Sequence, residues 1–243
     1  ASLLGGYTPT NADAIPFMTM GGTASGTFTT TNLPSGFSAG YNLAAGEASR
    51  LIYAIPGTKS FLNTASDLNW ATASNWSGST LPGVGDTALI SSGYAVIHSS
   101  GTDSIAGLTI NASNSLNVSG GSLAVSGATN GGGTLSVAGG TLSLNGPTNI
   151  ATLNFSSGTI NQNAALSTTT FIQSGGTWNQ VSSTLPGFSA TDFRITGGTF
   201  IRALGGDGST APYQLTDVYG LQGMGSSGML AKSYTLANNI DAS

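Results

Sequence analysis

Five ten-residue segments in the middle of the chain share a pattern of apolar residues separated by a turn of small residues. They read LNVSGGSLAV (116–125), LSVAGGTLSL (135–144), LNFSSGTINQ (153–162), FIQSGGTWNQ (171–180) and FRITGGTFIR (193–202). The first apolar residue of each segment recurs at intervals of 19, 18, 18 and 22 residues, and so does the apolar residue seven positions later. Two registers that stay locked together over five copies indicate a structural repeat.

Each copy predicts one turn of a solenoid. Alternating apolar and polar residues are typical of half-buried strands, and the small residues between them predict a sharp turn. The eleven or twelve residues that remain in each repeat leave room for a third strand. We therefore predict an all-β fold, a right-handed parallel β-helix (solenoid) with flanking β-strand segments, and prefer it to a β-sandwich because sandwich strands do not repeat in register. The inward residues should stack in two columns, one of Leu116, Leu135, Leu153, Phe171 and Phe193 and one of Leu123, Leu142, Ile160, Trp178 and Phe200.

The repeats coincide with a long uncharged stretch. The chain of 243 residues has 5 Lys or Arg and 9 Asp or Glu, and none of them lies between Asp103 and Asp192. Like charges stacked about every 4.8 Å along a solenoid would repel one another. The shortage of charge is therefore interpreted as a requirement of the stacking.

Composition also disfavours several classes of protein. The absence of cysteine excludes disulfides, cysteine zinc sites and thiol catalysis. The net charge of −4 argues against a nucleic-acid partner, which requires clustered Lys and Arg. No apolar run of about 18 residues predicts a transmembrane segment, and no secretion signal is recognised in this stretch.

The sequence divides into four segments by composition and pattern. Residues 1–58 are predicted as β-strands and interpreted as the close of a preceding module. Residues 59–103 are predicted as a Trp-containing cap with the first strands, and residues 104–203 as the β-helix turns. Residues 204–243 form a tail, interpreted as the start of a following module, with a short helix expected over Val218 to Met224.

Catalysis is not predicted. Glycosidases need two carboxyl groups that face one bond, whereas the acidic residues here are scattered and residues 104–191 contain no ionisable side chain. We predict no catalytic residue, no cofactor and no metal site. His98 is interpreted as a structural histidine and residues 205–208 as a tight turn rather than a calcium-binding repeat. Arg194 and Arg202 are expected to be solvent-exposed charges at the end of the repeats.

Aromatic residues in the flanks are the candidates for ligand contact. Trp70 and Trp76 are interpreted as cap or packing residues, and the alternative is an exposed platform on which a sugar ring stacks. Tyr213 and Tyr219 are the further candidates for glycan contact. Trp178 occupies an inward position of the repeat, so packing is predicted for it.

The chain resembles a known class of bacterial proteins. The repeated Gly-Gly-Thr-apolar turns, the tail with Leu221-Gln222 and residues 234–241 (YTLANNID), and the pattern over residues 75–86 resemble filamentous-haemagglutinin-type, autotransporter-like surface adhesins. The resemblance covers about residues 60–243. It implies a right-handed β-helix shaft that is secreted across a Gram-negative envelope to the cell surface.

These observations lead to one functional expectation with two alternatives. We expect an extracellular structural or adhesive β-helix segment of a bacterial surface or fibre protein, acting as a stiff shaft or biofilm matrix fibre. The alternatives are a dedicated glycan-binding adhesin and a tailspike-like polysaccharide depolymerase. The expected partners are further copies of the chain, end to end or in a tandem array, and surface glycans.

Overall fold

A computed structural model describes residues 14–18, 37–41, 49–53 and 57–241. The chain forms two compact units, residues 1–57 and residues 58–243. Much of the segment 1–58, predicted as strands, lies outside the described residues.

The described part of the first unit is an antiparallel sheet with the strand order β1–β3–β2. In this sheet Ala14 lies opposite Ile52, and Phe37 lies opposite Tyr53. The three strands are β1 (Ala14–Met18), β2 (Phe37–Tyr41) and β3 (Ser49–Tyr53).

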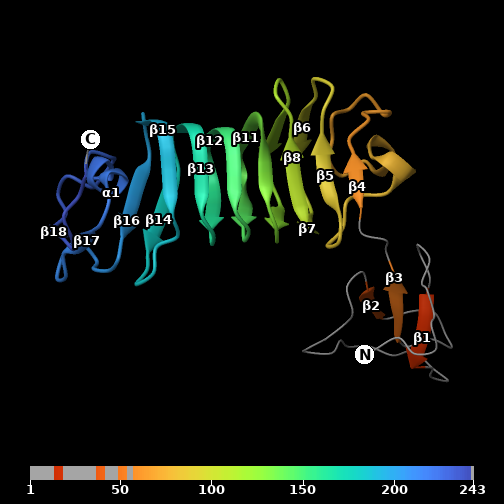
Figure 1. Cartoon of the computed structure of the whole chain (residues 1–243), viewed down its shortest axis with the longest axis horizontal. Helices are drawn as coiled ribbons and strands as arrows, with labels where there is room; N and C mark the ends of the chain where they lie inside the picture. The colour runs from red at the N-terminus through yellow and green to blue at the C-terminus, as the bar shows by residue number, and fades with distance from the viewer. Residues whose placement is uncertain (1–13, 19–36, 42–48, 54–56, 242–243) are drawn as a thin grey trace. The chain divides into compact units, whose positions relative to one another are not determined.

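The second unit is a β-solenoid of about eight turns, in which parallel strands of successive turns stack on one another (Figure 1). Each turn after the first contributes a strand to each of three faces, as the repeat predicted. The first face consists of β4 (Thr58–Ser60), β5 (Thr87–Ile90), β8 (Gly107–Ile110) and the first parts of β11 (Thr129–Leu144), β12 (Thr148–Gln162), β13 (Leu166–Gln173) and β15 (Phe188–Ile195).

The other two faces use the remainder of the same long strands together with short ones. The second face comprises β6 (Ala95–His98), β9 (Ser115–Val118), the middle of β11 and β12, and the ends of β13 and β15. The third face comprises β7 (Thr102–Ile105), β10 (Ser122–Val125), the ends of β11 and β12, β14 (Thr177–Val181) and β16 (Thr199–Ala203).

The two predicted inward columns are confirmed. Leu116, Leu135, Leu153, Phe171 and Phe193 are consecutive partners in the ladder of the second face. Leu123 pairs with Leu142, Leu142 with Ile160, and Trp178 with Phe200 on the third face. In the later turns the core is aromatic: the rings of Phe171 and Phe193 stack with centroids 5.1 Å apart, and those of Trp178 and Phe200 with centroids 5.7 Å apart.

The glycine of each turn between the second and third faces is required by the backbone. Gly198 has φ of 79°, a conformation that other residues rarely adopt. A Cβ atom there would also lie 2.4 Å from the carbonyl oxygen of Gly176 in the turn below. Successive turns therefore approach too closely at this corner for any side chain.

The solenoid begins earlier than the sequence repeat, because β4 and β5 already belong to the first face. Two short 3-10 turns, Ala73–Asn75 and Ser77–Ser79, follow β4 and carry the Trp-containing segment. Trp76 donates from its indole Nε1 to the carbonyl of Trp70 at 2.8 Å, and its ring packs edge-on against Phe61 at 5.0 Å. This segment therefore fills the first turns of the core.

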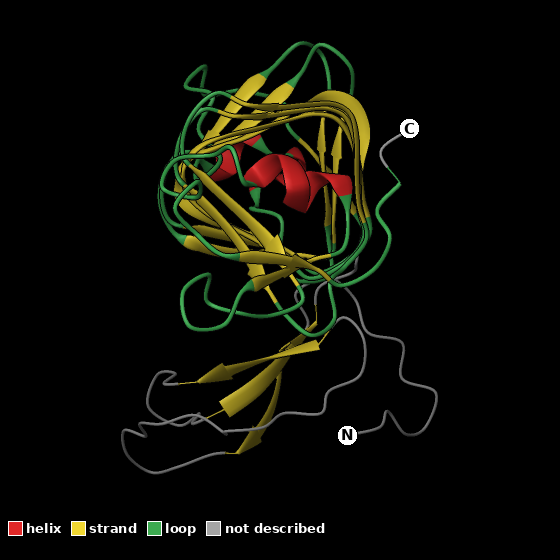
Figure 2. Cartoon of the chain, turned by 90° about the vertical axis from the view of Figure 1, so that its left-hand side faces the viewer, coloured by secondary structure: helices red, strands yellow, loops and turns green. Residues whose placement is uncertain are grey.

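The tail forms one more parallel pair and the only α-helix among the described residues. The pair joins β17 (Tyr213–Leu215) and β18 (Tyr234–Leu236), and the helix is α1 (Val218–Gly223), which confirms the predicted short helix. Viewed from this end of the molecule, α1 lies across the outline of the solenoid (Figure 2). A Cβ atom at Gly220 or Gly223 would lie 2.6 Å from a carbonyl oxygen of β16, so both glycines allow the helix to pack directly on the last turn.

Candidate functional site

The ladder of the third face is interrupted at one step. It runs without a break from β7 through β10 and β11 to β12, and β14 pairs with β16, but within residues 57–241 no strand pairing joins β12 to β14. The backbone groups on the facing edges of these two strands are therefore left without a ladder. We call the space between residues 159–162 and residues 177–181 the slot.

An insertion in the chain lies beside the slot. The corner from the third face to the first contains three residues between Leu144 and Thr148 and again three between Gln162 and Leu166. Between Gln180 and Phe188 it contains seven. The four additional residues lie in the loop 181–187, and they account for the interval of 22 residues in the repeat.

The slot holds a hollow of about 300 Å³ lined by residues 160–163, 179–182 and 184–186. The lining carries amide and hydroxyl side chains but no ionisable group. Asn161, Asn163 and Asn179 are exposed at its rim, and Val181 adds an apolar side chain that is 40% exposed. The site is therefore neutral and of mixed polarity.

Beneath the slot, an inward column changes from apolar to polar. Val125 pairs with Leu144, Leu144 pairs with Gln162, and Gln180 pairs with Arg202 in the ladders of the third face. Gln162 and Arg202 are nevertheless buried, at 6% and 4% exposure. Buried polar groups are stable only when their hydrogen bonds are made.

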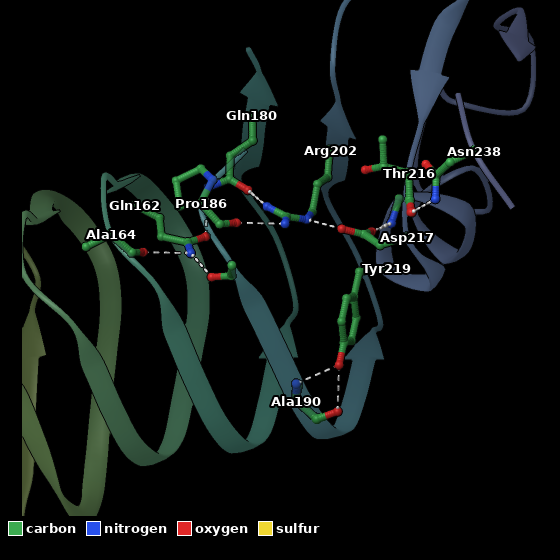
Figure 3. A network of polar contacts seen from close by, with 12 residues as sticks. Gln162, Ala164, Gln180, Pro186, Ala190, Arg202, Thr216, Asp217, Tyr219 and Asn238 are labelled. Atoms are coloured by element: carbon green, nitrogen blue, oxygen red, sulfur yellow. Dashed lines mark hydrogen bonds and ion pairs between the residues drawn. The ribbon is translucent and has the colours of Figure 1, made fainter. Parts of the chain in front are cut away.

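The polar side chains of this column hydrogen-bond to one another from turn to turn (Figure 3). Gln180 donates from Nε2 to Oε1 of Gln162 at 2.7 Å and accepts from Nη1 of Arg202 at 2.6 Å. Arg202 also donates from Nε to Oδ2 of Asp217 at 2.6 Å and from Nη2 to the carbonyl of Pro186 at 2.8 Å. The guanidinium group thus connects three segments that are distant in sequence.

The same column holds the loop beside the slot. Gln162 donates from Nε2 to the carbonyls of Ala164, at 3.0 Å, and Gly187, at 2.7 Å. The Arg202 guanidinium carbon lies 5.7 Å from the centre of the Phe188 ring, within the range of a cation–π contact. The C-terminal end of the loop 181–187 is therefore tied to buried side chains.

The far end of the network is the cap of α1. Asp217 is the N-cap residue, and its Oδ1 accepts from the backbone N–H of Gly220 at 2.8 Å while Oδ2 accepts from Arg202. The backbone N–H of Ala190 donates to the Tyr219 hydroxyl at 2.8 Å, and that hydroxyl donates to the Ala190 carbonyl at 3.2 Å. The helix that covers the last turn is thus joined to the column and to β15.

The four aromatic candidates for glycan contact do not form a site. Trp70 and Trp76 are buried, with 0% and 1% exposure. Neither offers a ring face to a sugar, so the exposed-platform alternative is wrong. Tyr213 is buried in the small tail cluster with Leu215. The half-buried Tyr219 packs its ring against Phe188 at 4.9 Å, and Trp178 is buried, as predicted.

Other singled-out residues serve local structure, with one correction. His98 is buried, its Nδ1 faces the carbonyl of Gly120 at 3.0 Å and its Nε2 lies 2.9 Å from Oδ2 of Asp103, which fits the predicted structural role. Arg194 is 60% exposed and pairs with Asp192. The expectation of an exposed Arg202 is wrong, because its position in the repeat points the side chain inward.

The turn at residues 205–208 is stabilised by its own aspartate. Asp207 accepts from the backbone N–H groups of Ser209, at 2.7 Å, and Ala211, at 3.0 Å, and from the hydroxyls of Ser209 and Thr210. Hydrogen bonds from Thr210, Ala211 and Ser209, in that order of importance, hold the pKa of this carboxyl well below its usual range. The described residues hold no cluster of three or more His, Cys, Asp or Glu arranged to bind a metal ion.

Comparison with known proteins identifies no relative of the chain. No protein family, curated protein or solved structure matches the chain. Among the described residues, no helix has the length and apolar character needed to cross a bilayer.

Sequence reasoning missed the slot and the polar column, although both left a signal. The interval of 22 residues between the last two copies marks the insertion that forms the loop 181–187. The tenth residue of the repeat segment faces inward throughout. It is apolar in the first two copies (Val125 and Leu144) and polar in the last three (Gln162, Gln180 and Arg202). The polarity of these residues favoured solvent exposure, whereas their position in the strand directs their side chains into the core.

Proposed function

We propose that the second unit is a stiff shaft segment of an extracellular bacterial surface or fibre protein. The observation that carries this proposal is the continuous parallel stacking of turns around a filled core. Strands of neighbouring turns pair on three faces, apart from the step between β12 and β14 on the third face, and large side chains from Trp70 to Phe200 fill the interior. Bending such a column would stretch hydrogen bonds on one side and compress the core on the other.

The outward surface supports the same role. Neutral side chains of neighbouring turns hydrogen-bond to one another, as Asn163 Nδ2 does to Asn145 Oδ1 at 2.7 Å and Asn161 Nδ2 to Ser143 Oγ at 3.1 Å. These ladders add side-chain bonds to the backbone bonds without placing like charges one above another. The resemblance to filamentous-haemagglutinin-type adhesins supports the cell-surface location.

The shaft is tested by its mechanics. A tandem fusion of residues 58–243 should appear by electron microscopy as straight rods whose length grows with the number of copies. It should also resist proteinase K, a protease with little dependence on charged residues. Flexible beads on a string, or rapid cleavage within residues 104–203, would contradict the proposal.

The location is tested on cells of the native source. Antibodies against the folded chain should label intact cells as strongly as permeabilised ones. Labelling that requires permeabilisation would contradict the extracellular assignment and leave the mechanical result standing.

A further inference from the structure

We propose that the slot binds a neutral saccharide, a binding activity beyond the shaft role. The first support is the interruption itself. Elsewhere on the third face neighbouring strands pair with each other, whereas β12 and β14 face each other with unpaired edges. Backbone donors and acceptors left without a ladder require other partners, and a ligand rich in hydroxyl groups supplies both kinds.

The chemistry of the lining narrows the ligand class. Side-chain amides such as those of Asn161 and Asn179 donate and accept at once, which matches hydroxyl groups. Beside them Val181 and Pro186 offer apolar surface for the C–H face of a sugar ring. A charged ligand would find no counter-charge among the lining side chains, and a purely apolar one would leave the amides unpaired.

The width of the slot disfavours an inserted peptide strand. Several Cα pairs of β12 and β14 lie within 8 Å of each other. A strand between them would require about 9.6 Å, twice the usual spacing of about 4.8 Å. A saccharide that lies along the mouth and reaches inward with its hydroxyl groups needs no such separation. The hollow of about 300 Å³ is large enough for a sugar ring.

The walls of the slot are held in place before any ligand arrives. Gln162 and Arg202 bind the carbonyls of Gly187 and Pro186, so one side of the slot rests on buried hydrogen bonds. A wall that is already ordered loses little conformational entropy on binding. Since the lining lacks a carboxylate, the geometry supports retention of the saccharide rather than its hydrolysis.

The test uses the full chain and a set of neutral oligosaccharides, namely oligomers of glucose, galactose, mannose and N-acetylglucosamine. An acidic oligosaccharide and a neutral extended peptide serve as comparison probes. Isothermal titration calorimetry should detect at least one neutral oligosaccharide, and backbone NMR shifts should change over residues 159–163 and 177–186. Binding of only the acidic probe or only the peptide, or of no member of the set, would overturn the proposal.

A matched pair of variants locates the site. The double variant Asn161→Ala/Asn179→Ala should weaken binding about tenfold or more. Asn130→Ala/Asn149→Ala removes two exposed amides from paired positions on the first face and should leave affinity unchanged. Unchanged affinity in the slot variant, or NMR shifts outside the slot, would refute the site. The NMR map of the unmodified chain decides the matter if the slot variant does not fold.

Discussion

Arg202 offers the sharpest test of how the last turns are held together. Arg202→Met keeps much of the side-chain volume but removes the guanidinium group. The variant loses the hydrogen bonds to Asp217, Gln180 and Pro186, which measure 2.6, 2.6 and 2.8 Å. Because the side chain is only 4% exposed, water cannot simply replace the guanidinium group at the Gln180 oxygen.

The expected loss follows from these bonds. Hydrogen bonds to a charged group contribute about 1.5–3 kcal/mol each, but the Asp217 side chain is 27% exposed and recovers part of its hydration. Removing one partner of a buried ion pair typically costs about 3–5 kcal/mol, and we expect a loss in that range. For a domain of this size each kcal/mol lowers Tm by about 2–4 °C, so Tm should fall by about 6–20 °C.

Urea and thermal unfolding followed by circular dichroism and tryptophan fluorescence measure this loss. Arg194→Met is the matched control, because Arg194 also pairs with an aspartate but is 60% exposed, so solvent screening should make its effect on stability far smaller than that of Arg202→Met. Arg202→Lys should fall between the two, since an ammonium group cannot span acceptors on three sides. Equal stability of Arg202→Met and Arg194→Met would refute the role of the buried column.

Three further changes probe other parts of the second unit. Leu142→Asp should lose about 3–5 kcal/mol in urea unfolding because it buries an unpaired charge. Asn145→Asp, at the exposed position that follows the same strand, should stay within about 1 kcal/mol. Equal losses would refute the inward register. Gly223→Ala should lower the free energy of unfolding by about 1–2 kcal/mol, because its Cβ would lie 2.6 Å from a β16 carbonyl oxygen. Gly225→Ala is the control, because a Cβ atom there has room. Equal Tm values for the two variants would contradict the close packing of α1. The lowered pKa of Asp207 means that its contribution to stability is complete above about pH 4 and is lost as pH falls through the folded-state pKa. Carbon NMR titration should therefore give a midpoint below that of ordinary aspartate, and a midpoint at the ordinary value would contradict the turn geometry.

The stacking was predictable because it is a local rule repeated many times. The alternation of side chains along a strand determines which residues face inward. A constant repeat length then places equivalent residues above one another in successive turns. Leu116 and Phe193 could therefore be assigned to the same column from their spacing alone. Their burial depends on no particular partner, only on the presence of a turn above and below.

Arg202 and the slot were not predictable in the same way. Charge favours solvent for an isolated arginine, and the compensation for burial comes from Gln180, Pro186 and Asp217, which lie 22, 16 and 15 residues away. No spacing rule joins these three to one guanidinium group. For Trp70 and Trp76 the preferred interpretation as packing residues was right, and only the exposed-platform alternative was wrong. Both interpretations require the same residue type, so only the fold separates them.

The polar column explains how a solenoid accommodates an open step without losing its continuity. At the level of the slot, β12, β13 and β15 still pair on the first and second faces. Two of the three ladders therefore continue to join successive turns. On the third face the chain of side-chain bonds from Gln162 through Gln180 to Arg202 crosses the step where strand pairing is missing. An apolar residue at Gln162 or Gln180 would pack but could not bridge it. In this chain, a change from apolar to polar in an inward column, next to a lengthened repeat, therefore marks the step at which strand pairing on the third face is interrupted.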